Sequence, residues 1–329
     1  MRAAWYERNG AATEVLNVGE LPDPVAGPGE ILVRVHASGV NPSDVKSRAG
    51  TRGKMPFARI IPHSDAAGMI VGVGPGVAES RVGQRVWVYN AQWQRPFGTA
   101  ASLVALPAAL AVPLLDRTSF ADGACLGIPA STAHHAVFAD GRVVGKTVLV
   151  TGGAGAVGHY AVQLAKWGGA RVIATVSGDA KAAHARAGGA DVVINYRTED
   201  VAAAVMDATN GAGVDRIVEV EFGGNLAVTE KVLKPYGVVA AYGSTADPTP
   251  ALPFYPLMYR AISIRTLLVY MLSGEARAKT IADLTRAMET GMLRHTIAET
   301  YPLGEIARAH ETVESGKAIG NIVIDLNAD

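Results

Sequence analysis

The sequence predicts an α/β protein with two domains, one rich in short strands and the other built on a doubly wound parallel sheet. The chain has 329 residues, of which 49% are hydrophobic, enough material for two buried cores. Roughly the first 115 residues hold short apolar strands separated by glycine and proline, a pattern typical of a compact β-barrel. From Phe120 onward, helical patterns alternate with apolar strands, as they do in a doubly wound sheet.

The β-rich part begins with a clear strand at residues 30–36, directly after a turn segment rich in proline and glycine at 22–29. Two further strands are expected at 67–73 and 85–89, where apolar and β-branched residues predominate. Short strands of this kind indicate that the first domain is a β-barrel rather than a set of βαβ units.

The second domain is expected to hold six strands with helices between them. The strands are expected at 147–151, 172–176, 192–194, 216–220, 238–242 and 262–269. After about residue 274 we expect a helix, a turn near Tyr301 and Pro302, another helix, and a final apolar strand at 321–326. This last strand has no place in the six-stranded sheet, so it is expected to return to the first domain. The expected domains are therefore 1–122 with 271–329, and 123–270.

A glycine-rich turn follows the first strand of the second domain, which covers residues 148–151. Its three regularly spaced glycines are Gly152, Gly155 and Gly158. Such glycines let backbone N–H groups approach a phosphate at a helix N-terminus, here at Ala156 and Val157. Ala154 departs from the usual G-x-G-x-x-G order, so a tight turn without a ligand is the alternative. The next strand, at 172–176, completes a βαβ unit, which favours a bound dinucleotide and hydride transfer.

Composition excludes several other classes of protein. The chain has 30 basic and 30 acidic residues, so its net charge of zero does not favour nucleic acid as a partner. No apolar run is long enough to span a membrane, and the first residues lack the apolar core of a signal peptide. The single cysteine, Cys125, excludes an internal disulfide and a multi-thiolate zinc site. We therefore expect a cytoplasmic protein.

The tip of the strand at 172–176 indicates which nucleotide is bound. A fold that prefers NAD places an acidic residue there, about 20 residues past the glycines, to bind the ribose 2′-hydroxyl. Here Ser177 follows the strand, and Asp179 comes two residues later, where it is expected to cap the next helix. Lys181 lies one turn further on and can reach a 2′-phosphate, although it can equally be a solvated helix lysine. This pattern favours NADPH.

Six segments together make the chain resemble a known family, the quinone oxidoreductase (zeta-crystallin-like) branch of the medium-chain dehydrogenase/reductase superfamily. The segments are 35–42, 62–68, 127–133, 148–158, 193–197 and 301–303. Their order and spacing run over nearly the whole chain. The resemblance implies a GroES-like β-barrel catalytic domain plus a Rossmann domain with a doubly wound parallel six-stranded sheet. It also implies NADPH as cofactor, reduction of quinones or other activated carbonyl compounds, and no zinc.

The resemblance also implies roles for individual residues. Asn41 and Thr132 match positions that line the nicotinamide cleft, although a turn residue and a helix cap are the alternatives. The implied cofactor-binding positions are Gly152, Gly155, Ala156, Val157, Gly158, Ser177, Lys181, Tyr196, Gly243, Ser244, Leu268 and Asn321. Of these, Ser177, Lys181 and Tyr196 match positions that select NADPH. For Leu268, a place in the strand core is the alternative.

The residues themselves argue against a catalytic zinc. By resemblance to the zinc alcohol dehydrogenases, a ligand cysteine would be expected at the position of Ser38. The Gly-His-Glu pattern of those enzymes is replaced by Pro62-His63-Ser64-Asp65, and His63 with Asp65 supplies too few ligands. We expect Asp65 to bind backbone N–H groups and His63 to line the cleft.

Lys46 is the main departure from the family pattern, because the family typically has a tyrosine five residues past the Asn of Asn-Pro. The lysine could stabilise a developing oxyanion or could be exposed to solvent. Cys125 is expected to pack in the core, since no base pairs with it in the sequence. No residue is an obvious general acid. Hydride transfer to a quinone needs little beyond orientation, so the cofactor supplies the chemistry and the protein positions it.

These observations favour an NADPH-dependent, zinc-independent reductase of quinones or related carbonyl compounds. The alternatives are a reductase of the C=C bond of an enal, enone or enoyl thioester, and a non-catalytic NADPH-binding redox sensor. A homodimer or homotetramer is also expected. The apolar segment 253–259 leads into a strand at the sheet edge that could pair across a two-fold axis, although the segment could instead pack on its own domain.

Overall fold

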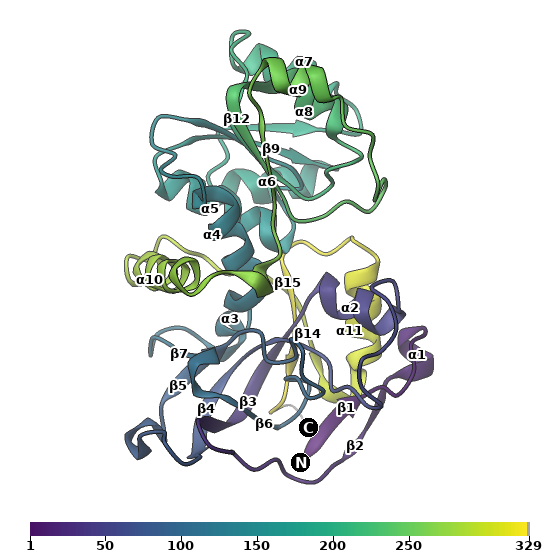
Figure 1. Ribbon diagram of the computed structural model, residues 1–329, viewed down its shortest axis with the longest axis vertical. Helices are drawn as coiled ribbons and strands as arrows, with labels where there is room; N and C mark the ends of the chain where they lie inside the picture. Colours follow the sequence, from purple (N-terminus) through teal and green to yellow (C-terminus); the bar gives the residue numbers. More distant parts are fainter. Residues whose placement is uncertain (328–329) are drawn as a thin grey trace. The chain divides into compact units, whose positions relative to one another are not determined.

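A computed structural model describes residues 1–327 (Figure 1). The chain divides into two compact units, Met1–Pro129 with His295–Asp329, and Ala130–Arg294. The expected domain boundaries differ from this division, since residues 123–129 belong to the first unit and 271–294 to the second. The second difference has a clear cause, because helix α10 (Gly274–Glu289) packs on helix α4 (Ser131–Phe138). There His134 hydrogen-bonds to Asp283 at 2.8 Å and to Thr280 at 3.0 Å.

The second unit contains a parallel six-stranded sheet in the order β10-β9-β8-β11-β12-β13. Its strands are β8 (Thr147–Val150), β9 (Arg171–Val176), β10 (Val192–Asn195), β11 (Val214–Glu219), β12 (Leu233–Ala241) and β13 (Ser263–Thr266). This confirms the doubly wound sheet, and the strand order reverses between β8 and β11. In such sheets, ligands bind at the carboxyl ends of the strands where the order reverses.

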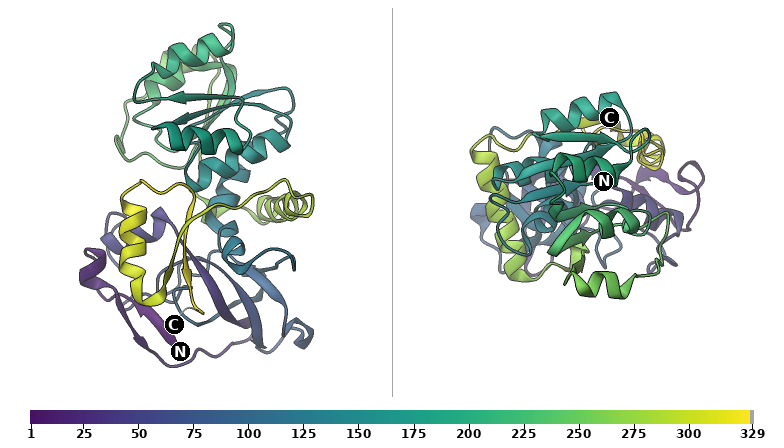
Figure 2. Two further views of the ribbon diagram at one scale, coloured as in Figure 1. Left: turned by 180° about the vertical axis from the view of Figure 1, so that it is seen from behind. Right: turned by 90° about the horizontal axis from the view of Figure 1, so that it is seen from above.

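Helices lie on both faces of this sheet, with α4, α5 and α6 on one face and α7 and α8 on the other (Figures 1 and 2). Their bounds are α5 (Ala156–Trp167), α6 (Asp179–Ala187), α7 (Val201–Ala208), α8 (Leu226–Val232) and α9 (Phe254–Tyr259). Buried aliphatic side chains of the strands, such as Leu149 on β8, Ile173 on β9 and Ile217 on β11, belong to one hydrophobic core. The strand expected at 262–269 is shorter than predicted, because the chain turns into a 3₁₀ helix, η4 (Val269–Met271).

The first unit contains a seven-stranded sheet in the order β14-β15-β3-β4-β5-β7, with β6 also paired to β3, and a separate pair β1-β2. The bounds are β1 (Arg2–Trp5), β2 (Asn17–Glu20), β3 (Glu30–Val40), β4 (Asp65–Val73), β5 (Arg85–Val88), β6 (Leu103–Pro107), β7 (Ala111–Pro113), β14 (Ile297–Pro302) and β15 (Asn321–Asp325). As expected, the last strand joins this sheet, where β15 pairs antiparallel with β3. The turn expected near Tyr301 and Pro302 begins one residue later, at the 3₁₀ helix η5 (Leu303–Glu305), but β14, which ends at Pro302 and runs parallel to β15, was not predicted.

Short helices complete the first unit, and two of them matter for the site. Helix α2 (Pro42–Ala49) and helix α11 (Ile306–Glu314) lie side by side (Figure 1). The other helical segments are α1 (Ala12–Val15), η1 (Glu79–Arg81), η2 (Ala108–Leu110), α3 (Phe120–Gly123), a π-helical turn η3 (Leu126–Ala130) and η5 (Leu303–Glu305). Among residues 1–327, no helix is both long and apolar enough to cross a membrane.

Candidate active site: a dinucleotide turn and a buried polar network

The glycine turn lies where the strand order of the parallel sheet reverses, between β8 and α5. Gly152 has a φ of 64°, a conformation that a residue with a side chain rarely adopts. A Cβ atom on Gly158 would lie 2.1 Å from the carbonyl oxygen of Gly152, so only glycine lets the helix start this close to the turn. Gly155 is the N-cap of α5, and Ala156 and Val157 begin the helix. The turn therefore presents bare backbone N–H groups at a helix N-terminus.

The end of β9 lies beside the end of β10, because the N–H of Tyr196 donates to the carbonyl of Val176 at 3.0 Å. Ser177 follows β9 without a carboxylate at the strand tip, and Lys181 is in the first turn of α6. Tyr196 has an exposed side chain. Asp179 does not cap α6 as expected. Gly178 is the N-cap, and Asp179 is the first residue of the helix.

A buried carboxylate, Glu219 at the end of β11, ties the glycine turn to the next loop. Its Oε1 accepts hydrogen bonds from the Thr151 hydroxyl at 2.7 Å, the Glu221 N–H at 2.7 Å and the Asn225 amide at 2.9 Å. Thr151 immediately precedes Gly152. Burial raises the pKa of Glu219, while these three donors oppose the rise. The sequence analysis did not identify Glu219, since a lone acid at a strand end carries no distinctive pattern.

Gly243 and Ser244 follow β12 at the same edge of the sheet, as expected. A Cβ on Gly243 would lie 2.4 Å from the carbonyl oxygen of Val220, so the two loops touch here. The Ser244 hydroxyl accepts from the Gly223 N–H at 2.9 Å and donates to the Asp247 carbonyl. The Ser244 hydroxyl is therefore engaged within the loop. Leu268 lies beyond the end of β13 and is 42% exposed, so it is not strand core.

Asn41 is the N-cap of α2 in the first unit, and its side chain is held by Asp65. The Asn41 amide donates to Asp65 Oδ2 at 2.9 Å, and the Asn41 backbone N–H donates to Asp44 at 2.8 Å. Because a carboxylate only accepts hydrogen bonds, this contact fixes which end of the amide faces Asp65. Asp65 Oδ2 also accepts from the Ile128 N–H at 2.8 Å, as expected of a carboxylate that binds backbone.

His63 belongs to the same buried network and does not line a cleft, contrary to expectation. Its side chain is fully buried, its Nδ1 lies 2.9 Å from the Ser38 hydroxyl, and its Nε2 lies 2.9 Å from His310 Nε2. His63 also has a φ of 75°, which is unusual for a residue with a side chain. Burial lowers the pKa of His63 to about 3 and holds that of His310 well below its usual value, so both imidazoles are neutral.

The other predicted site residues are distributed over both units. In the second unit, Thr132 is buried near the start of α4. In the first unit, Lys46 is half-buried on α2, and the Asn321 amide donates to the Thr296 carbonyl at 3.0 Å, which anchors the start of β15. Cys125 is buried, and burial raises the pKa of its thiol. Within residues 1–327, no group of three His, Cys, Asp or Glu side chains could hold a metal ion.

The residues at the sheet edge fit a 2′-phosphorylated dinucleotide. A close-fitting glycine turn at a helix N-terminus suits the pyrophosphate. The tip of β9 carries no carboxylate to repel a 2′-phosphate, and Lys181 follows it in α6. When bound, NADPH supplies a hydride, and the chain's own residues bind and orient it.

Comparison with known proteins agrees with this geometry. A family model described as zinc-binding dehydrogenase matches residues 156–287, and one described as alcohol dehydrogenase GroES-like domain matches residues 27–116. The chain is 30% identical to quinone oxidoreductase of Rattus norvegicus, over 90% of this chain and 88% of that protein. It is 31% identical to 2-haloacrylate reductase of a Burkholderia species, over 98% of both chains.

Solved structures are similar over almost the full length. The Escherichia coli quinone oxidoreductase complexed with NADPH matches with a TM-score of 0.89 and 25% identity, over 99% of this chain and 100% of that one. Mycobacterial Rv1454c complexed with NADPH matches with a TM-score of 0.88 and 29% identity, over 98% of this chain and 99% of that one. This chain belongs to the quinone oxidoreductase branch of the medium-chain dehydrogenase/reductase superfamily. It is an NADPH-dependent oxidoreductase that acts on a small-molecule substrate.

The substitution Gly158→Ala tests the glycine turn. The added methyl group meets backbone rather than a movable side chain, and overpacking of this kind costs about 1–3 kcal/mol. We expect the Kd for NADPH, measured by fluorescence titration, to rise about tenfold. Gly274→Ala is the matched control, because a Cβ at Gly274 meets nothing within 4 Å. An unchanged Kd in a folded Gly158→Ala protein would contradict the assignment of the glycine turn as the NADPH-binding site.

The substitution His63→Asn tests the buried imidazole pair. The unfolded state takes up a proton on His63 near pH 6.5 and the folded state only near pH 3, so stability falls as the pH drops between these values. Each such histidine makes the free energy of unfolding fall by about 1.4 kcal/mol for each pH unit by which the pH drops in this range. Asparagine tolerates positive φ and does not titrate. When the free energy of unfolding is measured with urea between pH 7 and 4.5, it should change less steeply with pH in His63→Asn than in the wild type. Ser38→Ala, which keeps both imidazoles, should retain the wild-type slope, and equal slopes in all three proteins would refute the account.

Proposed function

We propose that this protein is a zinc-independent NADPH:quinone reductase, which transfers hydride from the nicotinamide to a quinone or a related activated carbonyl compound. The observation that carries the proposal is the glycine turn at the strand-order reversal, followed by a second strand whose tip lacks a carboxylate. Relatives named quinone oxidoreductase support the acceptor class. The balanced charge and the single, buried cysteine support a cytoplasmic setting.

The residues of the first unit suit a reaction that needs orientation more than acid–base catalysis. Asp65 holds one N–H of the Asn41 amide. The same nitrogen carries a second N–H, which can donate to an acceptor oxygen of the substrate or of the nicotinamide ribose. The oxygen of a reduced quinone can take its proton from water, so no buried general acid is required. In this proposal, Thr132, Gly243, the Ser244 backbone, Leu268 and Asn321 contact the cofactor or the substrate.

Reduction of an activated C=C bond is the second candidate. It is favoured by the relative named 2-haloacrylate reductase, which matches 98% of this chain. The same hydride would then be delivered to carbon instead of oxygen.

The acceptor class and the role of Lys181 can be tested together by following the nicotinamide absorbance. We expect quinone-dependent oxidation of NADPH, with NADH much poorer. Lys181→Ala should raise the KM for NADPH about tenfold, because a charge-assisted hydrogen bond is worth about 1.5–3 kcal/mol, while the KM for NADH stays the same. Lys231→Ala, at an exposed position on α8, is the control. Turnover only of enals, enones or enoyl thioesters would favour the second candidate. NADPH binding without turnover of any acceptor would overturn both and favour a redox sensor.

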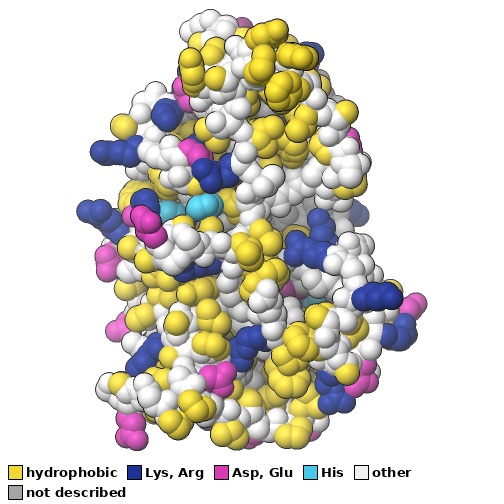
Figure 3. All heavy atoms as spheres, viewed as in Figure 1, with side chains coloured by type: hydrophobic (Ala, Val, Ile, Leu, Met, Phe, Trp, Pro, Cys, Tyr) yellow, Lys and Arg dark blue, Asp and Glu magenta, His cyan; other side chains and the backbone are white. Residues whose placement is uncertain are grey.

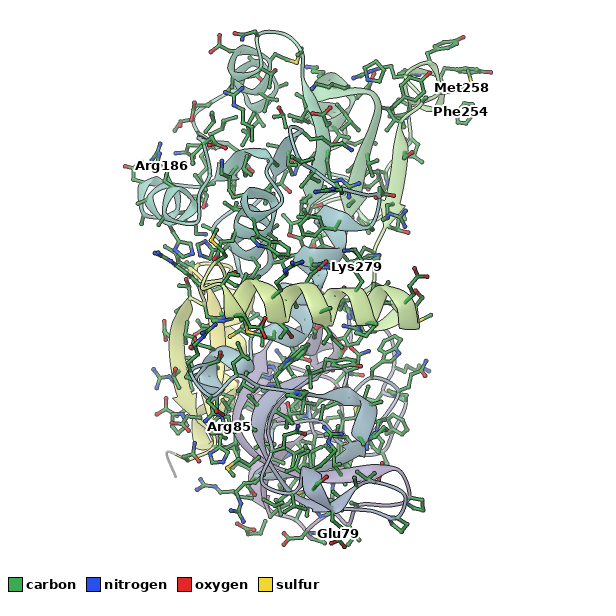
Figure 4. The ribbon with its side chains drawn as sticks, turned by 90° about the vertical axis from the view of Figure 1, so that its left-hand side faces the viewer. Glu79, Arg85, Arg186, Phe254, Met258 and Lys279 are labelled. Carbon is green, nitrogen blue, oxygen red and sulfur yellow. The ribbon has the colours of Figure 1, made fainter. Side chains whose placement is uncertain are left out.

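We also propose that the protein forms a homodimer through the free edge of β13. Exposed hydrophobic side chains gather on and around α9 (Figures 3 and 4), including Phe254 at 66%, Tyr255 at 63% and Tyr259 at 79% exposure. Among residues 1–327, strand β13 pairs only with β12, so within this part of the chain its outer edge lacks a partner strand. Apolar surface next to an open strand edge is typical of a two-fold interface.

Light scattering coupled to size exclusion should therefore give twice the chain mass. The double substitution Tyr255→Asp with Tyr259→Asp should give a monomer, since it places two charges in the proposed interface. Val144→Asp, a change at an exposed apolar residue outside this patch, should remain dimeric. A wild-type protein that stays monomeric at all concentrations would exclude the dimer.

A further inference from the structure

Glu219 is an acidic residue buried at the cofactor end of the parallel sheet, and the proposed hydride transfer does not use it. It is the last residue of β11 and is 1% exposed. Its partner Thr151 directly precedes Gly152, the first glycine of the turn, whose N–H is held by the Thr175 hydroxyl at 3.2 Å. A carboxylate therefore lies against the turn that suits the pyrophosphate, and the negative charges of the two groups repel each other.

The hydrogen bonds to Glu219 allow its charge to change without a rearrangement. The Thr151 hydroxyl, the Glu221 N–H and the Asn225 amide all donate to the same oxygen, Oε1. A proton on the other oxygen, Oε2, leaves these three bonds in place, because Oε1 then accepts them as a carbonyl oxygen. The side chain can thus be ionised or neutral within one hydrogen-bond network.

The titratable neighbours of Glu219 are themselves acidic. The loop after β11 supplies Glu221, a second carboxylate, and the residue after β12 is Tyr242, whose pKa is raised by burial and by the charge of Glu219. The side chains that face Glu219 from the end of β8 and from the N-cap of α8, Thr151 and Asn225, are uncharged. Within the described part of the chain, no cation shifts the pKa of Glu219. Burial and Glu221 both raise this pKa, and only hydrogen bonds oppose the rise.

We propose that Glu219 takes up a proton when NADPH binds, so that its carboxyl group is neutral beside the bound pyrophosphate. The pyrophosphate brings negative charge to the glycine turn, which favours the protonated side chain more in the complex than in the free protein. The proton comes from solvent and converts the carboxylate to the carboxylic acid, and no bond of NADPH changes. The inference concerns cofactor binding alone and does not depend on which acceptor is reduced.

The sign of the pH dependence follows from this linkage. The pKa of Glu219 is higher in the complex than in the free protein, so binding takes up a proton at any pH between the two values. In that range the affinity for NADPH increases as the pH falls, by at most about tenfold per pH unit for one proton. Above both pKa values the carboxylate stays ionised, and binding is weakened by the full repulsion.

The substitution Glu219→Gln tests the proposal, because the amide oxygen can accept the same three hydrogen bonds and carries no charge. We expect this variant to bind NADPH about tenfold more tightly than the wild type at pH 8.5, and about threefold more tightly or less at pH 6. A merely structural role of Glu219 predicts the opposite sign, weaker binding by the variant at every pH. The Kd is measured by fluorescence titration. The 2′-phosphate of NADPH also ionises near about pH 6, but it does so with both proteins, so their ratio isolates Glu219.

The matched control is Asp215→Asn. Asp215 lies near the other end of β11 and also links this strand to β8, since it accepts from the Thr147 N–H at 2.7 Å. The change removes a carboxylate charge from the same strand at the opposite edge of the sheet, where the charge is screened from the turn, so the Kd for NADPH should stay within about twofold of wild type. An equal gain in Asp215→Asn would show an effect of net charge and overturn the proposal.

Calorimetry gives a second measurement, which needs no variant to fold. Binding heats in two buffers of different ionisation enthalpy report the protons taken up between pH 6.5 and 8.5. NADH is the probe, because it carries the pyrophosphate without the 2′-phosphate. The wild type should take up part of one proton per chain, and Glu219→Gln should take up less. The proposal is overturned if the wild type takes up no proton at any pH, or if the two proteins take up equal amounts.

Discussion

The first unit depends on one buried carboxylate, that of Asp65, which is completely shielded from solvent. Through Oδ2 it holds the Asn41 side chain at the start of α2 and the Ile128 backbone in the π-helical turn. Asp65 itself begins β4, so it joins three segments that are distant in sequence. The neighbouring Gly127 leaves room for this contact, because a Cβ there would lie 2.0 Å from Asp65 Oδ1. A buried charge is tolerated when N–H groups donate to it, and here the bond from the Asn41 amide also fixes the orientation of that side chain.

The second unit uses a similar arrangement at the edge of its parallel sheet. Glu219 accepts hydrogen bonds from Thr151, just after β8, and from Glu221 and Asn225, which follow β11. Glu221, two residues on, accepts from the backbone N–H groups of Thr245 and Ala246 in the loop after β12. The loops around the glycine turn are thus braced against one another. Such bracing limits how far the turn can move when a charged pyrophosphate binds.

The parts of the structure that the sequence predicted correctly are governed by local patterns. The six parallel strands, the glycine turn and the alternation of helices follow from apolar periodicity and glycine spacing. The prediction was incomplete where a local signal covered only part of the structure. Tyr301-Pro302 predicted the turn that begins at Leu303 but not the strand β14 before it, which Pro302 ends. The strand expected to run to Val269 stops at Thr266, because an apolar run alone does not mark where the chain turns.

The candidate site was predicted only in part, because its contacts are distant in sequence. His63 and His310 are 247 residues apart, and nothing in the spacing of the histidines indicated that they meet. The same holds for Arg48 on α2 and Glu314 on α11, which form an ion pair although they are 266 residues apart. By contrast, the close approach of Gly158 to Gly152 follows from a short motif whose neighbours in sequence are also neighbours in space.

The position of β15 in the middle of its sheet has a consequence for how the chain is made. Strand β15 lies between β14 and β3, and β3 was synthesised nearly the whole chain earlier. During translation, the first unit must wait with an open sheet edge until the last strand leaves the ribosome, while the second unit, continuous in sequence, can already close its sheet. Nascent chains of this protein therefore expose the edge of β3 at residues 37–40 for most of their synthesis, since β6 pairs only with residues 30–34, and this is the stage at which a chaperone would be of most use.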